Sequence, residues 1–115
     1  MAHVHESQEL LAAQGRKLRE AIPNVYAAHG AMQRAVMVDA ALTRRTKELI
    51  ALAISVTREC DGCIVSHARG AARAGATRDE VAETMGVAIY MNGGPGTVWG
   101  PRALAAYDEM VAEHS

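Results

Sequence analysis

Aromatic residues are scarce in this sequence, and phenylalanine is absent. Only 3% of the 115 residues are aromatic, although half are hydrophobic. β-Sheets depend on aromatic and β-branched side chains, whereas alanine, the commonest residue here, is the strongest helix former. The composition therefore predicts an all-α fold with a core of Ala, Leu, Ile, Val and Met. The length suggests one domain over residues 1–115.

The sequence also lacks the features that mark nucleic-acid-binding, membrane and secreted proteins. Its net charge is −1 with both signs mixed along the chain, so there is no basic footprint for nucleic acid. No apolar run approaches the roughly 20 residues of a membrane-spanning helix. The first fifteen residues contain no apolar segment typical of a secretory signal. We expect a cytoplasmic protein with neither nucleic acid nor membrane as a partner.

Apolar periodicity and the placement of Pro, Gly and capping residues predict about six helices. Pro23 suits a first helical turn, and Thr77 with Glu80 forms a capping box. Pro101 lies inside the last predicted helix, which is therefore kinked or starts late. The predicted helices cover about 6–21, 23–39, 43 to a corner at 59–63, 60–74, 77–91 and 97–113, with a break at 92–96.

Two cysteines at close spacing are followed by a histidine. Cys60 and Cys63 are three residues apart, and His67 follows four residues later. At a helix start such cysteines need only modest adjustment to form a disulfide. A histidine one turn away and a helix N-terminus both favour a thiolate. The spacing predicts that Cys63 is a peroxidatic thiol with His67 as its base, and that Cys60 resolves the sulfenic acid to a disulfide.

Glu48 begins the most apolar helix, where an ionised carboxylate needs a partner. It lies roughly 16 Å before the corner, whereas His67 lies only about 8–9 Å past it, at 1.5 Å per residue. The two side chains can meet only if the helices cross, or if water or another subunit fills the gap. An ordinary salt bridge from Glu48 to Arg44 or Arg45 is the alternative interpretation.

Other roles for the cysteines have specific requirements. Zinc could use Cys60, Cys63 and His67, with Glu48 or a histidine of another subunit as fourth ligand. Structural zinc sites usually have a second ligand pair, and this chain has no other cysteine. Haem attachment needs histidine directly after the second cysteine, where this chain has Ile64. Burial of both cysteines as small hydrophobic residues is a further possibility. We expect neither a metal nor a cofactor.

These residues belong to a longer familiar pattern. The segment LTRRTKELIALA, residues 42–53, resembles the signature of the carboxymuconolactone decarboxylase and AhpD-like superfamily. Glu48, Cys60, Cys63 and His67 meet its pattern Glu-x11-Cys-x2-Cys-x3-His in full. The glycines after His67 and the Gly-Gly-Pro before the last helix are also similar, so the resemblance covers about residues 20–112.

The resemblance implies a helical fold that forms dimers, trimers or hexamers, with sites near subunit interfaces. AhpD proteins are alkyl hydroperoxidases, which implies reduction of hydrogen peroxide or organic hydroperoxides. By similarity, Cys63 would form the sulfenic acid and Cys60 would resolve it and donate a proton. His67 and Glu48 would form a proton relay. A lipoylated or thioredoxin-like protein would reduce the disulfide.

The chain departs from this family pattern in two respects. Gly62 occupies the place of a histidine that the best-studied AhpD proteins have between the cysteines, so one relay member is missing. The chain is also short, equivalent to a single helical unit. The alternatives are therefore a redox-sensing or binding module with little turnover, or a decarboxylase-like enzyme. Decarboxylases of the superfamily mostly lack the cysteine pair.

Overall fold

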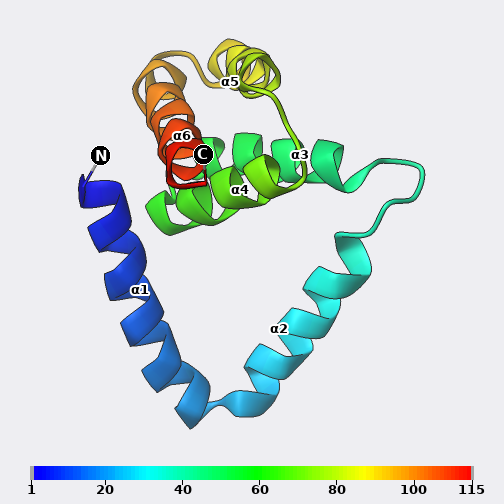
Figure 1. Cartoon of the computed structure of the whole chain (residues 1–115), viewed down its shortest axis with the longest axis vertical. Helices are drawn as coiled ribbons and strands as arrows, with labels where there is room; N and C mark the ends of the chain where they lie inside the picture. The colour runs from blue at the N-terminus through cyan, green and yellow to red at the C-terminus, as the bar shows by residue number, and fades with distance from the viewer. Residues whose placement is uncertain (1, 115) are drawn as a thin grey trace.

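The computed structural model describes residues 2–114, with side chains from Glu9 onward. Six helices and no strand occur in this range, which confirms the all-α prediction (Figure 1). None of the helices between residues 2 and 114 is both long and apolar enough to cross a bilayer. The helices are α1 Ala2–Ala21, α2 Pro23–Val36, α3 Arg44–Thr57, α4 Asp61–Arg73, α5 Arg78–Asn92 and α6 Gly94–Glu113.

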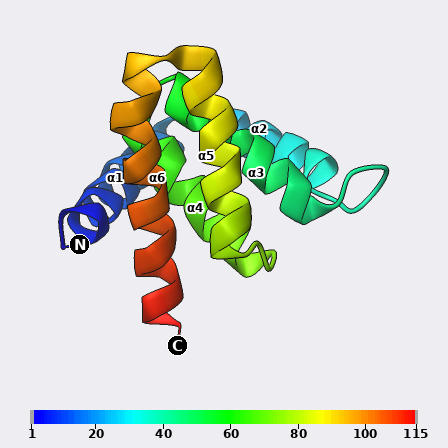
Figure 2. The same ribbon diagram turned by 90° about the horizontal axis from the view of Figure 1, so that it is seen from above.

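Helices α3 to α6 pack together and contain the hydrophobic core. The neighbouring helices α5 and α6 lie side by side and pack on α3 and α4 (Figure 2). Burial of a large apolar side chain stabilises the fold by about 1.5–3 kcal/mol, and several small alanines let the helix axes approach closely. The core residues include Leu52, Val56, Ile64, Val65, Ala68, Ala71, Val81, Met85, Ala88, Ala103, Ala106 and Met110.

Helices α1 and α2 form a V that stands away from this core (Figure 1). Their apolar stripes follow the predicted helical periodicity, yet no side chain of α2 is buried. Val25 and Met32 are 60% and 61% exposed, and Leu18 of α1 is 51% exposed. The sequence therefore predicts the two helices correctly, whereas much of their apolar surface stays exposed in the described part of the chain.

Local sequence signals fix most helix ends as predicted. The Thr43 hydroxyl accepts a hydrogen bond from the Thr46 amide at the start of α3. Thr77 and Glu80 form the predicted capping box of α5, and the hydrogen bond from the Thr77 amide holds the pKa of Glu80 below its usual value. Gly75 has φ of 87°, a left-handed conformation that suits glycine after a helix.

The predicted late start of α6 is wrong. Gly93, with φ of 69°, alone separates α5 from α6, and α6 begins at Gly94. Pro95 lies in the first turn, where its missing amide hydrogen is not needed. Gly96 lets this turn approach α5, since a Cβ there would lie 2.8 Å from the Ile89 Cα. Pro101 is accommodated inside α6.

Candidate redox site at the corner of α3 and α4

The two cysteines lie where the corner between α3 and α4 enters α4. Cys60 is the N-cap residue, and its Sγ accepts a hydrogen bond from the Cys63 amide at 3.3 Å. The two residues form a disulfide with Cα atoms 5.3 Å apart. Cys63 is exposed, whereas Cys60 is half-buried. The more exposed residue of the pair is thus the cysteine one turn before His67.

Glu48 and His67 meet directly across the α3–α4 pair. The Nδ1 atom of His67 lies 2.8 Å from the Glu48 Oε1 atom, within hydrogen-bond distance. The Glu48 side chain is only 7% exposed, whereas His67 is 28% exposed and so remains accessible from one side. Glu48 and His67 lie at different distances from the corner along their helices, yet the packing of α3 against α4 brings their side chains into direct contact. No water or second subunit is needed to bridge them.

Gly70 explains how this contact forms. Glu48 lies eleven residues before Glu59, and Gly70 lies eleven residues after it, so the two face each other across the helix pair. A Cβ on Gly70 would overlap the Glu48 carboxylate. The carboxylate therefore occupies the space of the missing side chain and reaches His67 from there. The glycine at position 70 is visible in the sequence, but its role as a space for the Glu48 carboxylate can be recognised only once the packing of α3 against α4 is known.

Two side chains of α6 hold the cysteine corner from the other side. Arg102 is 15% exposed and forms a two-pronged ion pair with Asp61, at 2.6 and 2.9 Å. Trp99 donates an indole hydrogen bond to Glu59 at 2.7 Å. Asp61 and Glu59 flank Cys60, so both neighbours of the N-cap cysteine are anchored to α6. Sequence reasoning did not identify Trp99 or Arg102 as neighbours of the site, because they lie about 40 residues further along the chain.

A hollow of about 260 Å³ lies beside His67, between α2 and α4. Met32, Val36 and Met37 give it apolar walls, and His29 and Gln33 add polar groups. From sequence, His29 is more plausibly a packed or surface histidine than a ligand. The structure places His29 at the same hollow as His67. This proximity could not be predicted, because the two residues lie far apart in the sequence.

The zinc interpretation has no geometric support among residues 9–114. No group of three or more His, Cys, Asp or Glu side chains described there is arranged to hold a metal ion. The two sulfurs are bonded to each other, and Glu48 is hydrogen-bonded to His67. A dithiol beside a carboxylate-bound imidazole can exchange protons and form and break a disulfide, which is thiol redox chemistry.

We predict that Gly70→Ala disrupts the site, because the new methyl group would displace the Glu48 carboxylate. Overpacking of this kind costs about 1–3 kcal/mol of unfolding free energy, measurable by urea denaturation. Gly86→Ala is the matched control, since no atom lies within 4 Å of a Cβ there and the site is a helix interior. The control should be stabilised by up to about 1 kcal/mol. Equal effects of the two variants would contradict the packing argument.

We also predict that Trp99, the single tryptophan, reports the redox state of the corner. Reduction of the disulfide releases the backbone around Cys60, to which Glu59 and hence the indole are tied. Dithiothreitol should therefore change the tryptophan emission of the wild type. Cys60→Ser, which has no disulfide to reduce, should not respond. An identical wild-type spectrum in both states would show that α6 does not sense the corner.

Comparison with known proteins agrees with this architecture. The sequence pattern of the carboxymuconolactone decarboxylase family matches residues 23–108. The chain is 38% identical over 95 residues to an uncharacterized protein of Cupriavidus necator, covering 83% of this chain and 84% of that one. It is 40% identical over 80 residues to an uncharacterized protein encoded in the cox locus of Paracoccus denitrificans, covering 70% and 72%. An apo crystal structure of a carboxymuconolactone decarboxylase family protein from Legionella pneumophila superimposes with a TM-score of 0.91 at 34% identity, covering 96% and 98%. The chain therefore belongs to the carboxymuconolactone decarboxylase family.

Proposed function

We propose that this protein is a thiol-dependent peroxidase that reduces hydrogen peroxide or organic hydroperoxides through Cys60 and Cys63. The observation that carries the proposal is the arrangement around α4. An exposed cysteine, bonded to a half-buried one, lies one turn before a histidine that is hydrogen-bonded to a buried carboxylate. Each component has a separate task in peroxide chemistry.

Glu48 sets the protonation pattern of His67. A carboxylate accepts a hydrogen bond, so Nδ1 of His67 carries the hydrogen that faces Oε1. The Nε2 atom is then the basic nitrogen of the neutral ring. Because Cys63 precedes His67 by one helical turn, Nε2 is the group that takes the proton of the Cys63 thiol. Glu48 also stabilises the imidazolium that forms.

The reaction proceeds in two balanced steps. The Cys63 thiolate attacks the peroxide, an S–O bond forms as the O–O bond breaks, and His67 returns the proton to the departing alkoxide, which leaves as an alcohol. The Cys60 thiol then attacks the sulfenic acid of Cys63. A disulfide forms and water leaves, so the peroxide is reduced by two electrons and the dithiol is oxidised by two.

An external dithiol closes the cycle by thiol–disulfide exchange. It attacks the accessible sulfur of Cys63, and a second exchange releases the reduced protein and the oxidised reductant. A lipoylated or thioredoxin-like protein supplies this chemistry. The hollow beside His67 suits the alkyl group of an organic hydroperoxide, because Met32 and Val36 line it.

A redox-sensing role is the second candidate, and the packing of α1 supports it. The Leu11 Cδ1 atom lies 2.8 Å from the position that a Cβ on Gly62 would occupy. Gly62 stands between the cysteines, so α1 rests directly on the segment that changes on oxidation. A histidine at position 62 would require Leu11 to move. Oxidation and reduction could thus shift α1 without rapid peroxide turnover.

We predict that purified protein consumes peroxide with dithiothreitol or lipoamide as reductant. Cys63→Ser removes the nucleophile and should abolish turnover. Cys60→Ser leaves the sulfenic acid without its internal partner and should slow turnover at least about tenfold. The measurement is the rate of peroxide loss. Full activity in both serine variants would refute the peroxidase proposal, and slow wild-type turnover with a redox-dependent change in assembly would favour sensing.

We expect the pKa of the Cys63 thiol in the reduced protein to lie below that of an ordinary cysteine. The N-terminus of α4 and the adjacent imidazole both favour the thiolate. The rate of alkylation by iodoacetamide, measured against pH in Cys60→Ser, should therefore rise at lower pH than for a free thiol. His67→Asn should move this rise to higher pH. An ordinary or raised value in Cys60→Ser would count against His67 as base.

We further propose that the protein is a homo-oligomer in which a second copy covers the exposed faces of α1 and α2. Leu18, Val25 and Met32 are at least half exposed, and the Leu18–His29 surface contains a largely apolar hollow. Single exposed apolar residues are ordinary, whereas contiguous apolar faces on two helices mark an interaction surface. A second copy has the same faces and can cover them mutually.

The assembly prediction is tested by size-exclusion chromatography with light scattering. The wild type should be a dimer or larger. Val25→Asp/Met32→Asp should shift it toward monomer, because a charge on an apolar interface is desolvated without a partner. Ala27→Asp, on the opposite side of α2, is the matched control and should leave the mass unchanged. A monomeric wild type would contradict this proposal, whichever way the activity assay turns out.

A further inference from the structure

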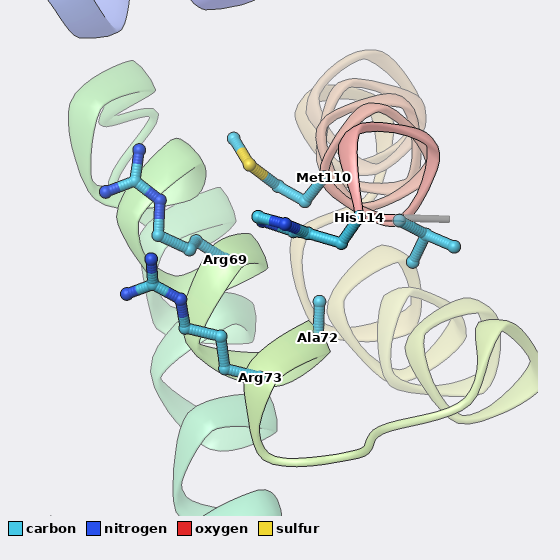
Figure 3. A pocket seen from close by; sticks show the side chains of 6 residues that line it. Arg69, Ala72, Arg73, Met110 and His114 are labelled. Carbon is cyan, nitrogen blue, oxygen red and sulfur yellow. The ribbon is translucent and has the colours of Figure 1, made fainter.

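A second hollow, of about 410 Å³, lies between α4 and the C-terminal end of α6 (Figure 3). Arg69, Ala72 and Arg73 line it from α4. Met110, Val111 and His114 line it from α6. We propose that this hollow binds a small amphipathic carboxylic acid, with its carboxylate at the two arginines and its short apolar chain against α6. The proposal is independent of the peroxidase function.

The hollow is separate from the redox site, although both use α4. Arg69 follows His67 by two residues, which is about 200° around a helix at 3.6 residues per turn. His67 and Ser66 face the hollow beside α2, whereas Arg69 and Arg73 face the one beside α6. Around α4, Arg69 and Arg73 lie roughly 120° and 80° from Cys63, so a ligand bound at the arginines sits on a different face of the helix.

The two arginines differ from the ion-paired arginines of this protein. Arg78 pairs with Asp108, and Arg102 pairs with Asp61. Arg69 and Arg73, by contrast, have no hydrogen-bond or ion-pair partner among the side chains from Glu9 to His114. They lie one turn apart, and Figure 3 shows both guanidinium groups extended in the same direction. Like charges at this spacing repel, so a bound anion would remove an unfavourable interaction.

Arg44 extends the positive region. It lines an adjacent hollow that Arg73 also borders, together with Arg45, whose Nε atom lies 3.9 Å from the Glu80 Oε2 atom. The only acid lining that hollow is Asp39, and one of its oxygens accepts a hydrogen bond from the Arg44 amide. Guanidinium groups match a carboxylate because they donate two parallel hydrogen bonds. The imidazole of His114 reaches into the hollow from the other side (Figure 3).

The rest of the lining is apolar, which defines the other end of the ligand. Met110 is 1% exposed and forms a closed floor, Ala72 is half-buried, and Val111 is 43% exposed at the rim. The volume lies within the range of small-molecule sites, about 300–1,000 Å³. A simple inorganic anion would leave this apolar surface uncovered, whereas a carboxylate with a short alkyl chain would cover it.

The structural alternative is that Arg73 and His114 serve only the ends of their helices. Cationic side chains near a helix C-terminus interact favourably with its dipole. Arg73 lies in the last turn of α4, and His114 is the C-cap residue of α6. This role affects stability and requires no ligand, so a binding measurement separates it from the proposal.

Isothermal titration with hexanoate tests the site on the full chain. Hexanoate should bind with saturation, and acetate and hexylamine should each bind at least about tenfold more weakly, since each lacks one half of the ligand. Arg69→Gln/Arg73→Gln should weaken hexanoate binding at least about tenfold. Arg16→Gln/Arg58→Gln removes two exposed charges elsewhere and is the matched control, with affinity within about twofold of the wild type.

Protein NMR on the wild type keeps the proposal testable even if the double variant unfolds. Hexanoate should shift the resonances of Ala72, Met110 and His114, and leave those of Cys63 and His67 unchanged. Absence of saturable hexanoate binding, or shifts confined to other residues, would overturn the proposal. Equal affinity for acetate would also overturn it, because the hollow would then be a simple anion site.

Discussion

The hydrogen bond between Glu48 and His67 is the constraint on which the site depends. It joins the first half of α3 to the middle of α4 and places a carboxylate in an interior that excludes most water. Burial of a carboxylate costs free energy unless the group is paired, so the hydrogen bond to the imidazole is what offsets the cost of burying Glu48. The missing side chain of Gly70 creates the space for this contact. The same contact holds Nδ1 of His67 at the Glu48 carboxylate and leaves Nε2 as the ring nitrogen that is not engaged by Glu48.

The cysteine corner is held by three helices at once. Helix α4 contributes the N-cap position of Cys60, α6 anchors the residues on both sides of it through Trp99 and Arg102, and α1 rests on Gly62 through Leu11. A disulfide that opens and closes here therefore acts on a segment with fixed neighbours. The anchoring to α6 fixes the residues on both sides of Cys60. The contact with α1 connects this corner to a helix whose Leu10 and Leu18 side chains are 59% and 51% exposed.

The sequence predicted the helices well, because periodicity, capping residues and prolines are local signals. The capping box at Thr77 and the N-cap role near Cys60 follow from a few adjacent residues. The predicted start of α6 was wrong, because the observed start depends on the close approach of Gly96 to α5. That approach is a tertiary contact, which local sequence signals do not reveal. The meeting of Glu48 and His67 was left open for the same reason. The sequence also could not show that much of the apolar stripes of α1 and α2 stays exposed within the described chain, since an apolar periodicity does not say which surface will bury it.

The central claim, that Cys63 is the peroxide-reactive thiol and Cys60 its resolving partner, is tested most directly by mass spectrometry. Reduced wild type treated with one equivalent of peroxide should lose two hydrogens and form an intramolecular Cys60–Cys63 disulfide. In Cys60→Ser the same treatment, with a sulfenic-acid trap such as dimedone, should label Cys63. Label on Cys60 in the Cys63→Ser variant instead, or a reduced wild type that stays unmodified, would contradict the account.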